Sequence, residues 1–359
     1  MNIIIDAMGG DFAPKEPVKG GLQAHKLYKC DITFVGKEDA IREVLTAEGI
    51  KELPDGVRIV NATEVVEICD DPARACLRKK DSSMTVGMNL LKKGEGDAFI
   101  SAGSTGALLS GATLLVKRIK GIKRAAVAPV IPTGAGHSLL VDAGANAECT
   151  SEYMVQFAYM GSFYMEKVMG KRNPKVGLLN IGAEPSKGNE LYKEVHQLLK
   201  EAGEAGRINF VGNVEPTQIA SKDAPDVIVA DGFTGNVMLK TMEGTANFIV
   251  RGLKNLFTTS MKTKVGYLMV KGNMGGFKKM LDSREVGGTS MLGIQCPVFK
   301  AHGNSDALAF QNTVKQAIRF VQADVNGAIV ENIDYMNVEK KKPLEALRSL
   351  AKKDNNENA

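Results

Sequence analysis

Four small residues of this chain, Gly103-Ser-Thr-Gly106, follow a short apolar run and precede a second apolar segment with helical spacing. A turn of this kind places backbone N–H groups and the hydroxyls of Ser104 and Thr105 at the first turn of a helix. Such a group of donors binds an anion such as phosphate. The same residues also suit a helix cap with a tight turn, and the sequence leaves both interpretations open.

The segment Asp231-Gly-Phe-Thr-Gly-Asn236 repeats this layout after another apolar run. Two glycines flank Phe233 and Thr234. Glycines at such positions allow a backbone to lie close to a bound group, and they also relieve a strained turn. The segment is therefore either a second ligand-binding loop or only a tight turn.

Four further polar residues stand near the ends of apolar runs. Lys187 lies in a loop, where its charge points either at a ligand or at solvent. Asp142 and Asn146 bracket a turn that either orients a nucleophile or caps the next helix. His302 stands directly before a C-terminal helical segment; an imidazole there suits proton transfer, and a structural role is the alternative.

These turns belong to a pattern that recurs five times, in which a short apolar run ends in Gly, Ser, Thr, Asn and Asp. The five runs with their turns span residues 2–10, 97–106, 138–146, 176–188 and 226–236. Each run predicts a buried parallel strand that leads through a loop into a helix. Because the carboxyl ends of parallel strands share one edge of an open sheet, we expect all five turns to line one ligand-binding edge.

Helical spacing fills the segments between these runs. Apolar residues recur at intervals of three and four over 38–48 and 190–201, and again over 310–329, where they predict one long C-terminal helix. Strands that alternate with helices predict an α/β fold, a three-layer α/β/α arrangement with a mostly parallel sheet. We expect a single domain over residues 1–340 and a polar, disordered tail over 341–359.

The composition is that of a large enzyme with an ample core, since 44% of the 359 residues are hydrophobic. No apolar run approaches the roughly 18 residues of a membrane span, so we expect a cytoplasmic protein. The five cysteines form no Cys-x-x-Cys pair and predict reduced thiols. The four histidines are widely separated, and the glycines between Asp6 and Asp11 favour a close chain crossing, so no metal site is expected.

Familiar nucleotide and hydrolase motifs are missing. No Gly-x-Gly-x-x-Gly follows a predicted strand, and residues 182–188 lack the order of a phosphate-binding P-loop. No Gly-x-Ser-x-Gly elbow offers a nucleophilic serine. The chain is therefore not expected to bind a dinucleotide or a nucleoside triphosphate in the usual way, and no cofactor is expected.

The charge of the chain is uneven. Its net charge is +5, yet residues 244–281 hold no acidic residue and seven cations, which leaves −2 for the rest. The seven are Arg251, Lys254, Lys262, Lys264, Lys271, Lys278 and Lys279. Apolar residues alternate with these cations, as they do in interfacial amphipathic elements, so we predict a basic helical arm at about 251–281 that contacts an anionic membrane. Two alternatives remain: the arm packs on the core or on a second subunit, or it binds an acidic carrier protein. A single local basic segment does not indicate binding to nucleic acid.

Together, the motifs resemble the signature blocks of the PlsX-type phosphate acyltransferases, in order and over nearly the whole chain. The blocks are Asp6-Ala-Met-Gly-Gly-Asp11, Ser101-Ala-Gly-Ser-Thr-Gly-Ala-Leu108, Asp142-Ala-Gly-Ala-Asn146, Gly177-Leu-Leu-Asn-Ile-Gly182, Lys187-Gly-Asn-Glu190, Asp231-Gly-Phe-Thr-Gly-Asn236 and Ala301-His-Gly-Asn-Ser-Asp306. Two positions depart from the pattern. Ser104 stands where many members have Asn, and Thr150-Ser151 replaces a common Lys-Pro, which removes a cation.

This resemblance implies a homodimeric enzyme that moves a fatty acyl group from acyl carrier protein to inorganic phosphate for phospholipid synthesis. It also implies a fold similar to isopropylmalate and isocitrate dehydrogenases and to phosphate acetyltransferases. Phosphate is already an anionic nucleophile, so the enzyme chiefly has to orient it and to stabilise the oxyanion of the thioester carbonyl. No metal or redox cofactor is needed for this chemistry.

The site residues expected for this reaction fall into three groups. Phosphate is assigned to Gly103, Ser104, Thr105 and Gly106. Catalysis is assigned to Lys187, which neutralises developing charge, to Asn236, which binds the oxyanion or the phosphate, and to His302, which protonates the leaving thiolate. Substrate binding is assigned to Asp142, Asn146, Asp231, Gly232 and Thr234. Two other functions stay open: a phosphate acetyltransferase or butyryltransferase that uses a coenzyme A thioester, and a non-catalytic lipid-associated scaffold.

Overall fold

The computed structural model describes residues 1–281 and 287–337, without the side chains of residue 271 and residues 273–281. The predicted tail over 341–359 lies outside the described residues. The strands are β1 (Asn2–Asp6), β2 (Asp31–Gly36), β3 (Val57–Asn61), β4 (Ala98–Ser101), β5 (Ala126–Ala128), β6 (Val130–Thr133), β7 (Gly136–Val141), β8 (Lys175–Leu179), β9 (Asn209–Val214), β10 (Val227–Val229), β11 (Thr289–Leu292) and β12 (Val298–Lys300).

The larger helices alternate with these strands. The helices are α1 (Lys15–Tyr28), α2 (Glu38–Ala47), α3 (Ala75–Arg78), α4 (Ser83–Lys92), α5 (Thr105–Gly111) with the π-helix η1 (Ala112–Val116), α6 (Ser151–Lys167), α7 (Glu190–Glu204), α8 (Pro216–Ile219), α9 (Gly232–Thr258), α10 (Met261–Leu281), α11 (Ala307–Gln322), α12 (Val325–Glu331) and α13 (Ile333–Met336). All five predicted units of strand, loop and helix are confirmed, with β1, β4, β7, β8 and β10 as their strands.

The described strands form two sheets, in the orders β3-β2-β1-β4-β12-β11-β5 and β6-β7-β10-β8-β9. Neighbouring strands are parallel except where β11 joins β12 and β5, and where β6 joins β7. The predicted mostly parallel arrangement is confirmed, but the prediction of one edge shared by all five turns is wrong. The chain leaves the first sheet at Pro129, between β5 and β6, and a proline has no N–H with which to continue the ladder.

Helices cover both faces of each sheet. Alternate residues of β1 point to opposite faces: Ile3 packs in a core cluster with Val18 of α1 and Phe310 of α11, whereas Ile4 packs with Met88 of α4. In the second sheet, Val227 and Val229 of β10 share a cluster with Phe157 of α6. Ile228, between them, belongs to a cluster against which Met238 of α9 packs. Helix, sheet and helix therefore form the three predicted layers twice.

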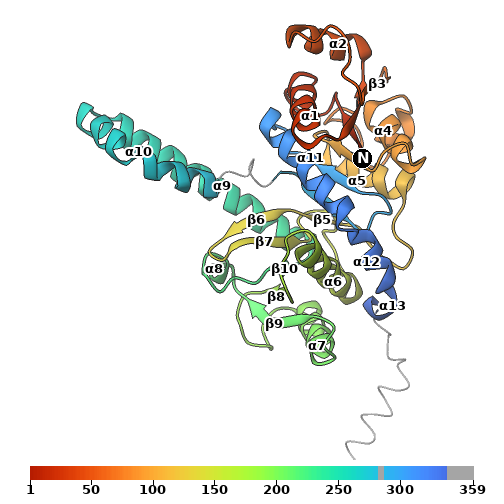
Figure 1. Cartoon of the computed structure of the whole chain (residues 1–359). Coiled ribbons are helices and arrows are strands. Elements are labelled where there is room, and N and C mark those ends of the chain that lie inside the picture. Colours follow the sequence, from red (N-terminus) through yellow and green to blue (C-terminus); the bar gives the residue numbers. More distant parts are fainter. Residues whose placement is uncertain (282–286, 338–359) are drawn as a thin grey trace, which may run out of the picture.

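α9 and α10 lie side by side and project away from the body of the molecule (Figure 1). The predicted boundary of the arm at about residue 251 falls inside α9, which begins at Gly232 directly after β10. The inner turns of α9 therefore belong to the second sheet, and only its outer end pairs with α10. The rings of Phe257 and Tyr267 join the two helices, with centroids 5.4 Å apart.

The prediction of one long C-terminal helix over 310–329 is wrong. α11 ends at Gln322, and Asp324 adopts the left-handed conformation, with φ of 47°. Its carboxylate caps the next helix, α12, by accepting the N–H of Gly327 at 3.0 Å. An aspartate tolerates this conformation better than most residues, so the apolar spacing continues while the helix axis does not.

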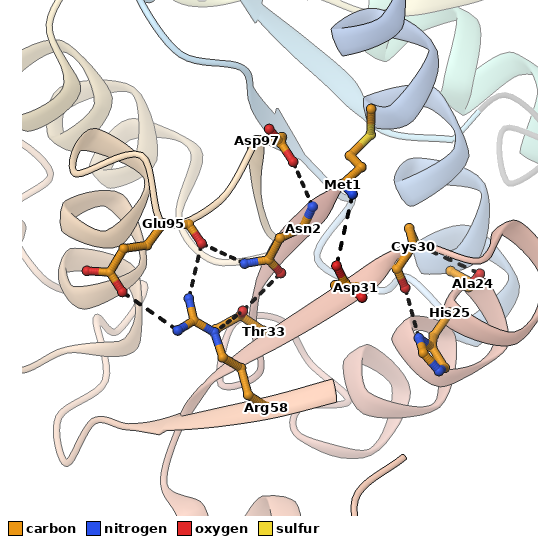
Figure 2. A network of polar contacts seen from close by, with 10 residues as sticks. All are labelled: Met1, Asn2, Ala24, His25, Cys30, Asp31, Thr33, Arg58, Glu95 and Asp97. Carbon is orange, nitrogen blue, oxygen red and sulfur yellow. Dashed lines mark hydrogen bonds and ion pairs between the residues drawn. The ribbon is translucent and has the colours of Figure 1, made fainter. Parts of the chain in front are cut away.

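A polar network ties β1, β2 and β3 together at the amino end of β1 (Figure 2). The side chain of Asn2 donates to the carbonyl of Glu95 at 2.6 Å and accepts the hydroxyl of Thr33 at 3.0 Å. Arg58 donates to Thr33 Oγ1 at 2.8 Å and pairs with the carboxylate of Glu95 at 3.7 Å. These hydrogen bonds and the ion pair connect the strands at the end of the sheet opposite to the turns where ligands are expected.

Within the described part of the chain, we find no helix whose length and hydropathy would let it cross a membrane.

Candidate functional site

The turn at the carboxyl end of β4 is held by a short chain of hydrogen bonds. The N–H of Gly103 donates to Ser101 Oγ at 3.0 Å, and the hydroxyl of Ser101 donates to Oδ2 of Asp6 at 2.6 Å. Burial raises the pKa of Asp6, while hydrogen bonds from Ser101, Ser83 and the nearby backbone lower it. The ends of β1 and β4 are thus joined at one buried carboxylate.

The predicted phosphate loop, residues 103–106, forms the N-terminus of the continuous helix α5–η1. Ser104 is the cap residue and accepts the N–H of Ala107 at 3.5 Å, so the capping interpretation is correct. The N–H of Gly103 is already used by Ser101. The N–H groups of Thr105 and Gly106 lie in the first turn, where a helix provides no acceptor, and they remain suited to an anion.

Lys300 is a candidate site residue that the sequence analysis missed. It is the last residue of β12, which pairs with β4, and its partly buried ammonium donates to the carbonyl of Ala102 at 3.1 Å and to that of Ala301. Burial lowers the pKa of Lys300 to about 8; the charges of Asp11 and Asp6 act in the opposite direction. A lysine directly after the apolar pair Val298 and Phe299 was the available signal.

His302 lies two residues beyond Lys300, and its side chain is exposed. Its carbonyl accepts the N–H of Ser305, and the following turn leads into α11, whose first turn is capped by Asp306. The neighbouring Gly303 accepts the N–H of Asp11 at 2.8 Å. The predicted close crossing between the 6–11 turn and another part of the chain is therefore this contact with the 301–306 turn.

At the second sheet, Asp142 is saturated by donors of the chain itself. Its carboxylate accepts the N–H groups of Val127 at 2.9 Å, Ala145 at 3.0 Å and Asn146 at 2.7 Å, together with the side-chain amide of Asn146 at 2.9 Å. Burial raises the pKa of Asp142, and these hydrogen bonds lower it. Asp142 does not cap the next helix, whose cap residue is Thr150. It holds the 142–146 turn, and a contact with substrate stays a prediction.

Asp231 caps α9. Its carboxylate accepts the N–H and the hydroxyl of Thr234, each at 2.8 Å, and the hydroxyl of Tyr192 at 2.5 Å. Burial, with the neighbouring Asp231, raises the pKa of Tyr192, so this phenol stays protonated and donates. The side chains of Asp231 and Thr234 thus shape the start of α9.

The two glycines of the 231–236 segment are required by the neighbouring turn. A Cβ on Gly235 would lie 1.9 Å from the carbonyl oxygen of Asp142, and one on Gly232 would lie 2.6 Å from that of Asn146. Gly232 also donates its N–H to Asn146 at 2.8 Å. The group that the backbone approaches is therefore the 142–146 turn of the same chain.

Lys187 and Asn236 are exposed at this edge. The Lys187 loop is fixed from below, because the buried side chain of Asn180 donates to the carbonyl of Lys187 at 3.1 Å. A Cβ on Gly144 would lie 3.5 Å from the amide of Asn236, so this side chain rests on the 142–146 turn. Both side chains lie where a substrate can reach them, and their roles stay predictions.

The predicted residues thus fall into two groups, one at each sheet. The 103–106 loop and His302 follow strands of the first sheet, where Lys300 ends β12, and the other predicted residues follow strands of the second. The hydrogen bond from Val127 of β5 to Asp142 joins the two sheets at this edge. Lys240 of α9 lies close enough to Lys300 to lower its pKa, so the first turns of α9 face the first group.

Two surface hollows of the described part of the chain lie away from both groups. One lies beside Lys26 and Ile50 and the other beside Gln295 and Asn326, and they include no residue of these loops. Among the described residues, no cluster of His, Cys, Asp or Glu has the make-up of a metal site. Burial raises the pKa of the Cys149 thiol to about 12, so this cysteine, beside Asn146, is protonated at neutral pH and is a poor nucleophile.

Comparison with known proteins gives a family and close relatives. Residues 1–328 match the model of a family described as fatty acid synthesis protein. The chain is 46% identical over 344 residues to the phosphate acyltransferase of Thermoanaerobacter pseudethanolicus, a match that covers 94% of this chain and 99% of that protein. It is 47% identical over 333 residues to the phosphate acyltransferase of Alkaliphilus oremlandii, with 93% and 97% covered.

Solved structures show the same fold. A phosphotransacetylase from Streptococcus pyogenes aligns with a TM-score of 0.59 over 90% of this chain and 94% of its own, at 16% identity. A 4-hydroxythreonine-4-phosphate dehydrogenase from Klebsiella pneumoniae aligns with a TM-score of 0.52 over 90% and 99%, at 11% identity. At these identities the likeness concerns the fold alone, and it confirms the predicted α/β/α class.

Proposed function

The chain belongs to the fatty acid synthesis protein family and is a phosphate acyltransferase, and we propose that acyl carrier protein donates the fatty acyl group that it passes to inorganic phosphate. The observation that carries this function is the match to phosphate acyltransferases at 46% and 47% identity over nearly the full chain. The product, an acyl phosphate, serves phospholipid synthesis.

In the proposed reaction, a phosphate oxygen attacks the carbonyl carbon of the thioester. A tetrahedral oxyanion forms and collapses, the carbon–sulfur bond breaks, and the carrier leaves as a thiolate that takes up one proton. Since phosphate is itself the nucleophile, the protein has to orient the two reactants and to stabilise negative charge. The protonated thiol of Cys149 agrees with direct transfer to phosphate, because no acyl-cysteine is needed.

Phosphate is assigned to the 103–106 loop in this proposal. The N–H groups of Thr105 and Gly106 and the hydroxyl of Thr105 supply the donors, while Ser101 fixes the loop through Gly103. Lys187 and Asn236 face the thioester from the second sheet, where an ammonium and an amide stabilise the oxyanion. His302, exposed beside the first sheet, protonates the thiolate.

We also propose that the α9–α10 arm attaches the enzyme to an anionic membrane. Beyond residue 250 of this arm, four cations with described side chains are exposed: Arg251, Lys254, Lys262 and Lys264. Leu268 and Met269 of α10 are 68% and 84% exposed, so two adjacent large apolar side chains lie open to solvent beside these cations. Each cation adds roughly 1 kcal/mol near an anionic surface, and apolar burial adds to that, so the attachment is reversible.

A homodimer and a cytoplasmic location complete the proposal. The homodimer follows from the resemblance to the PlsX-type enzymes, and the cytoplasmic location from the lack of an apolar run of membrane-spanning length in the sequence. The mass of the protein in solution, measured by light scattering, tests the homodimer. An acidic carrier protein and a second subunit are the competing occupants of the basic arm.

The proposed activity is tested by the release of carrier thiol from long-chain acyl carrier protein with and without phosphate. We expect thiol release only with phosphate, together with acyl phosphate in the mass spectrum. Equal release without phosphate would identify a thioesterase instead. A matched assay with acetyl and butyryl coenzyme A separates the proposal from a phosphate acetyltransferase or butyryltransferase, and no turnover with any donor would leave the scaffold function.

A further inference from the structure

Lys300 stands where two neighbouring strands of the first sheet end side by side. It ends β12, beside the end of β4, and its side chain turns toward the start of the 103–106 loop. The carbonyls of Ala102 and Ala301 accept two of its three N–H groups. Among the described residues, no carboxylate pairs with this ammonium within 4.0 Å, so a third donor is left for another partner.

Charges of both signs surround this ammonium. Asp6, at the end of β1, and Asp11, in the turn that follows, favour its cationic form. Lys240 of α9, on the side of the second sheet, disfavours it. Lys240 itself pairs with Glu243 of the same helix at 2.8 Å. Among the described residues, Lys300 is thus a cation of this region without a carboxylate partner within 4.0 Å, and an anion placed against it would stabilise its charged form.

We infer that Lys300 binds the phosphate substrate, with its ammonium placed against the anion held by the 103–106 loop. The inference rests on the proposed function and adds a cation to a phosphate site otherwise made of backbone N–H groups and hydroxyls. The carbonyls of Ala102 and Ala301 orient the ammonium without neutralising it.

This role makes phosphate binding depend on pH. The pKa of Lys300 in the free protein is about 8, and a bound phosphate raises it because opposite charges favour each other. Binding therefore favours the protonated lysine, and the affinity for phosphate falls as the pH rises through about 8. The groups whose charges act on this titration are Asp6, Asp11 and Lys240.

The test uses Lys300→Gln and Lys300→Arg in the full-length enzyme, with Lys315→Gln, an exposed lysine of α11, as the matched control. Steady-state kinetics with acyl carrier protein give the KM for phosphate, the KM for the acyl donor and kcat. We expect Lys300→Gln to raise the KM for phosphate by about 10- to 100-fold, the size expected for one lost charged hydrogen bond, with the KM for the donor unchanged. Lys300→Arg should keep most of the affinity and hold it above pH 8, because a guanidinium does not deprotonate there.

Direct binding of inorganic phosphate, measured by titration calorimetry, separates this inference from the proposed function. If the parent protein binds phosphate and Lys300→Gln does not, the inference holds even where acyl transfer fails. If Lys300→Gln is folded by circular dichroism and keeps the parent's KM and affinity for phosphate, the inference is overturned. Absence of phosphate binding to the parent protein overturns it as well. If Lys300→Gln does not fold, the affinity for phosphate is measured against pH for the parent and for Lys300→Arg. An identical pH dependence of the two affinities overturns the inference.

Discussion

The hydroxyl of Ser101 donates a 2.6 Å hydrogen bond to Oδ2 of Asp6, and Oγ of Ser101 in turn accepts the N–H of Gly103 at 3.0 Å. One hydroxyl therefore satisfies a buried carboxylate and fixes the loop to which phosphate is assigned. An unsatisfied buried donor or acceptor is costly, so this hydroxyl links stability to function.

We expect Ser101→Ala to lower the free energy of unfolding by about 1–3 kcal/mol, because Asp6 and the N–H of Gly103 both lose a partner. The KM for phosphate should rise in the same variant, since the loop is no longer fixed. Urea unfolding and steady-state kinetics measure the two effects. Ser110→Ala, which removes a hydroxyl within α5, is the control and should behave as the parent does. A Ser101→Ala protein with parental stability would show that the contact contributes little.

Lys187→Ala and Asn236→Ala should each reduce kcat by about 10²-fold or more, the scale for loss of one oxyanion donor. Both side chains are exposed at the carboxyl edge of the second sheet, so neither truncation should disturb the core. Turnover with acyl carrier protein and thermal unfolding are measured together, with Lys200→Ala on α7 as the control. Near-parental turnover in both variants would move the oxyanion site elsewhere.

Gly235→Ala should destabilise the fold by about 1–3 kcal/mol, because the new Cβ would lie 1.9 Å from the carbonyl oxygen of Asp142 and the two segments must separate. Gly252→Ala, in the same helix, is the matched control, since its Cβ would meet no atom within 4 Å. That control should be stabilising by about 0.5–1 kcal/mol, through the helix propensity of alanine. Chemical unfolding of both variants gives the difference, and equal midpoints would contradict the close contact.

Leu268→Glu combined with Met269→Glu should abolish flotation of the protein with anionic liposomes, because two charges replace two large, adjacent and exposed apolar residues of the arm. The parent should float, and less so as salt screens its cations. Ile68→Glu with Leu77→Glu, two exposed apolar positions away from the arm, is the control pair and should still float. Thiol release from soluble substrate should persist in all variants. If the parent never floats and the arm variant loses its dimeric mass, the arm is a subunit contact.

Asp11→Asn should move the alkaline loss of phosphate affinity to lower pH. The carboxylate of Asp11 favours the protonated form of Lys300, so its removal lowers the pKa of Lys300 below about 8, and the ammonium is lost earlier as the pH rises. The KM for phosphate, measured from pH 6.5 to 9.5, reports the shift. Asp223→Asn, an exposed aspartate in the loop after α8, should leave the profile in place. An unchanged profile in Asp11→Asn would separate Lys300 from the pH dependence.

The sequence by itself determined the local units of this protein. Apolar runs that end in Gly, Ser, Thr, Asn and Asp gave five correct strands with their loops and helices, since strand period and turn chemistry are local properties. The motif blocks identified the family, which the comparisons confirmed. The cap at Ser104 was also readable, because a cap depends on residues three positions apart.

Only the tertiary structure decided how these units meet. The structure has two sheets where one was expected. Pro129 interrupts the chain between β5 and β6, but the local sequence does not determine in which sheet the next strand pairs. Ser101 and Asp6, which form a hydrogen bond, are 95 residues apart in the sequence. Gly232 and Gly235 of α9 are required by the 142–146 turn, which lies far earlier in the chain. In the sequence, Lys300 does not differ from any other lysine at the end of a strand. Its burial, its carbonyl partners and its charged neighbours come from β1, β4 and α9, and no local pattern encodes an environment assembled from such distant segments.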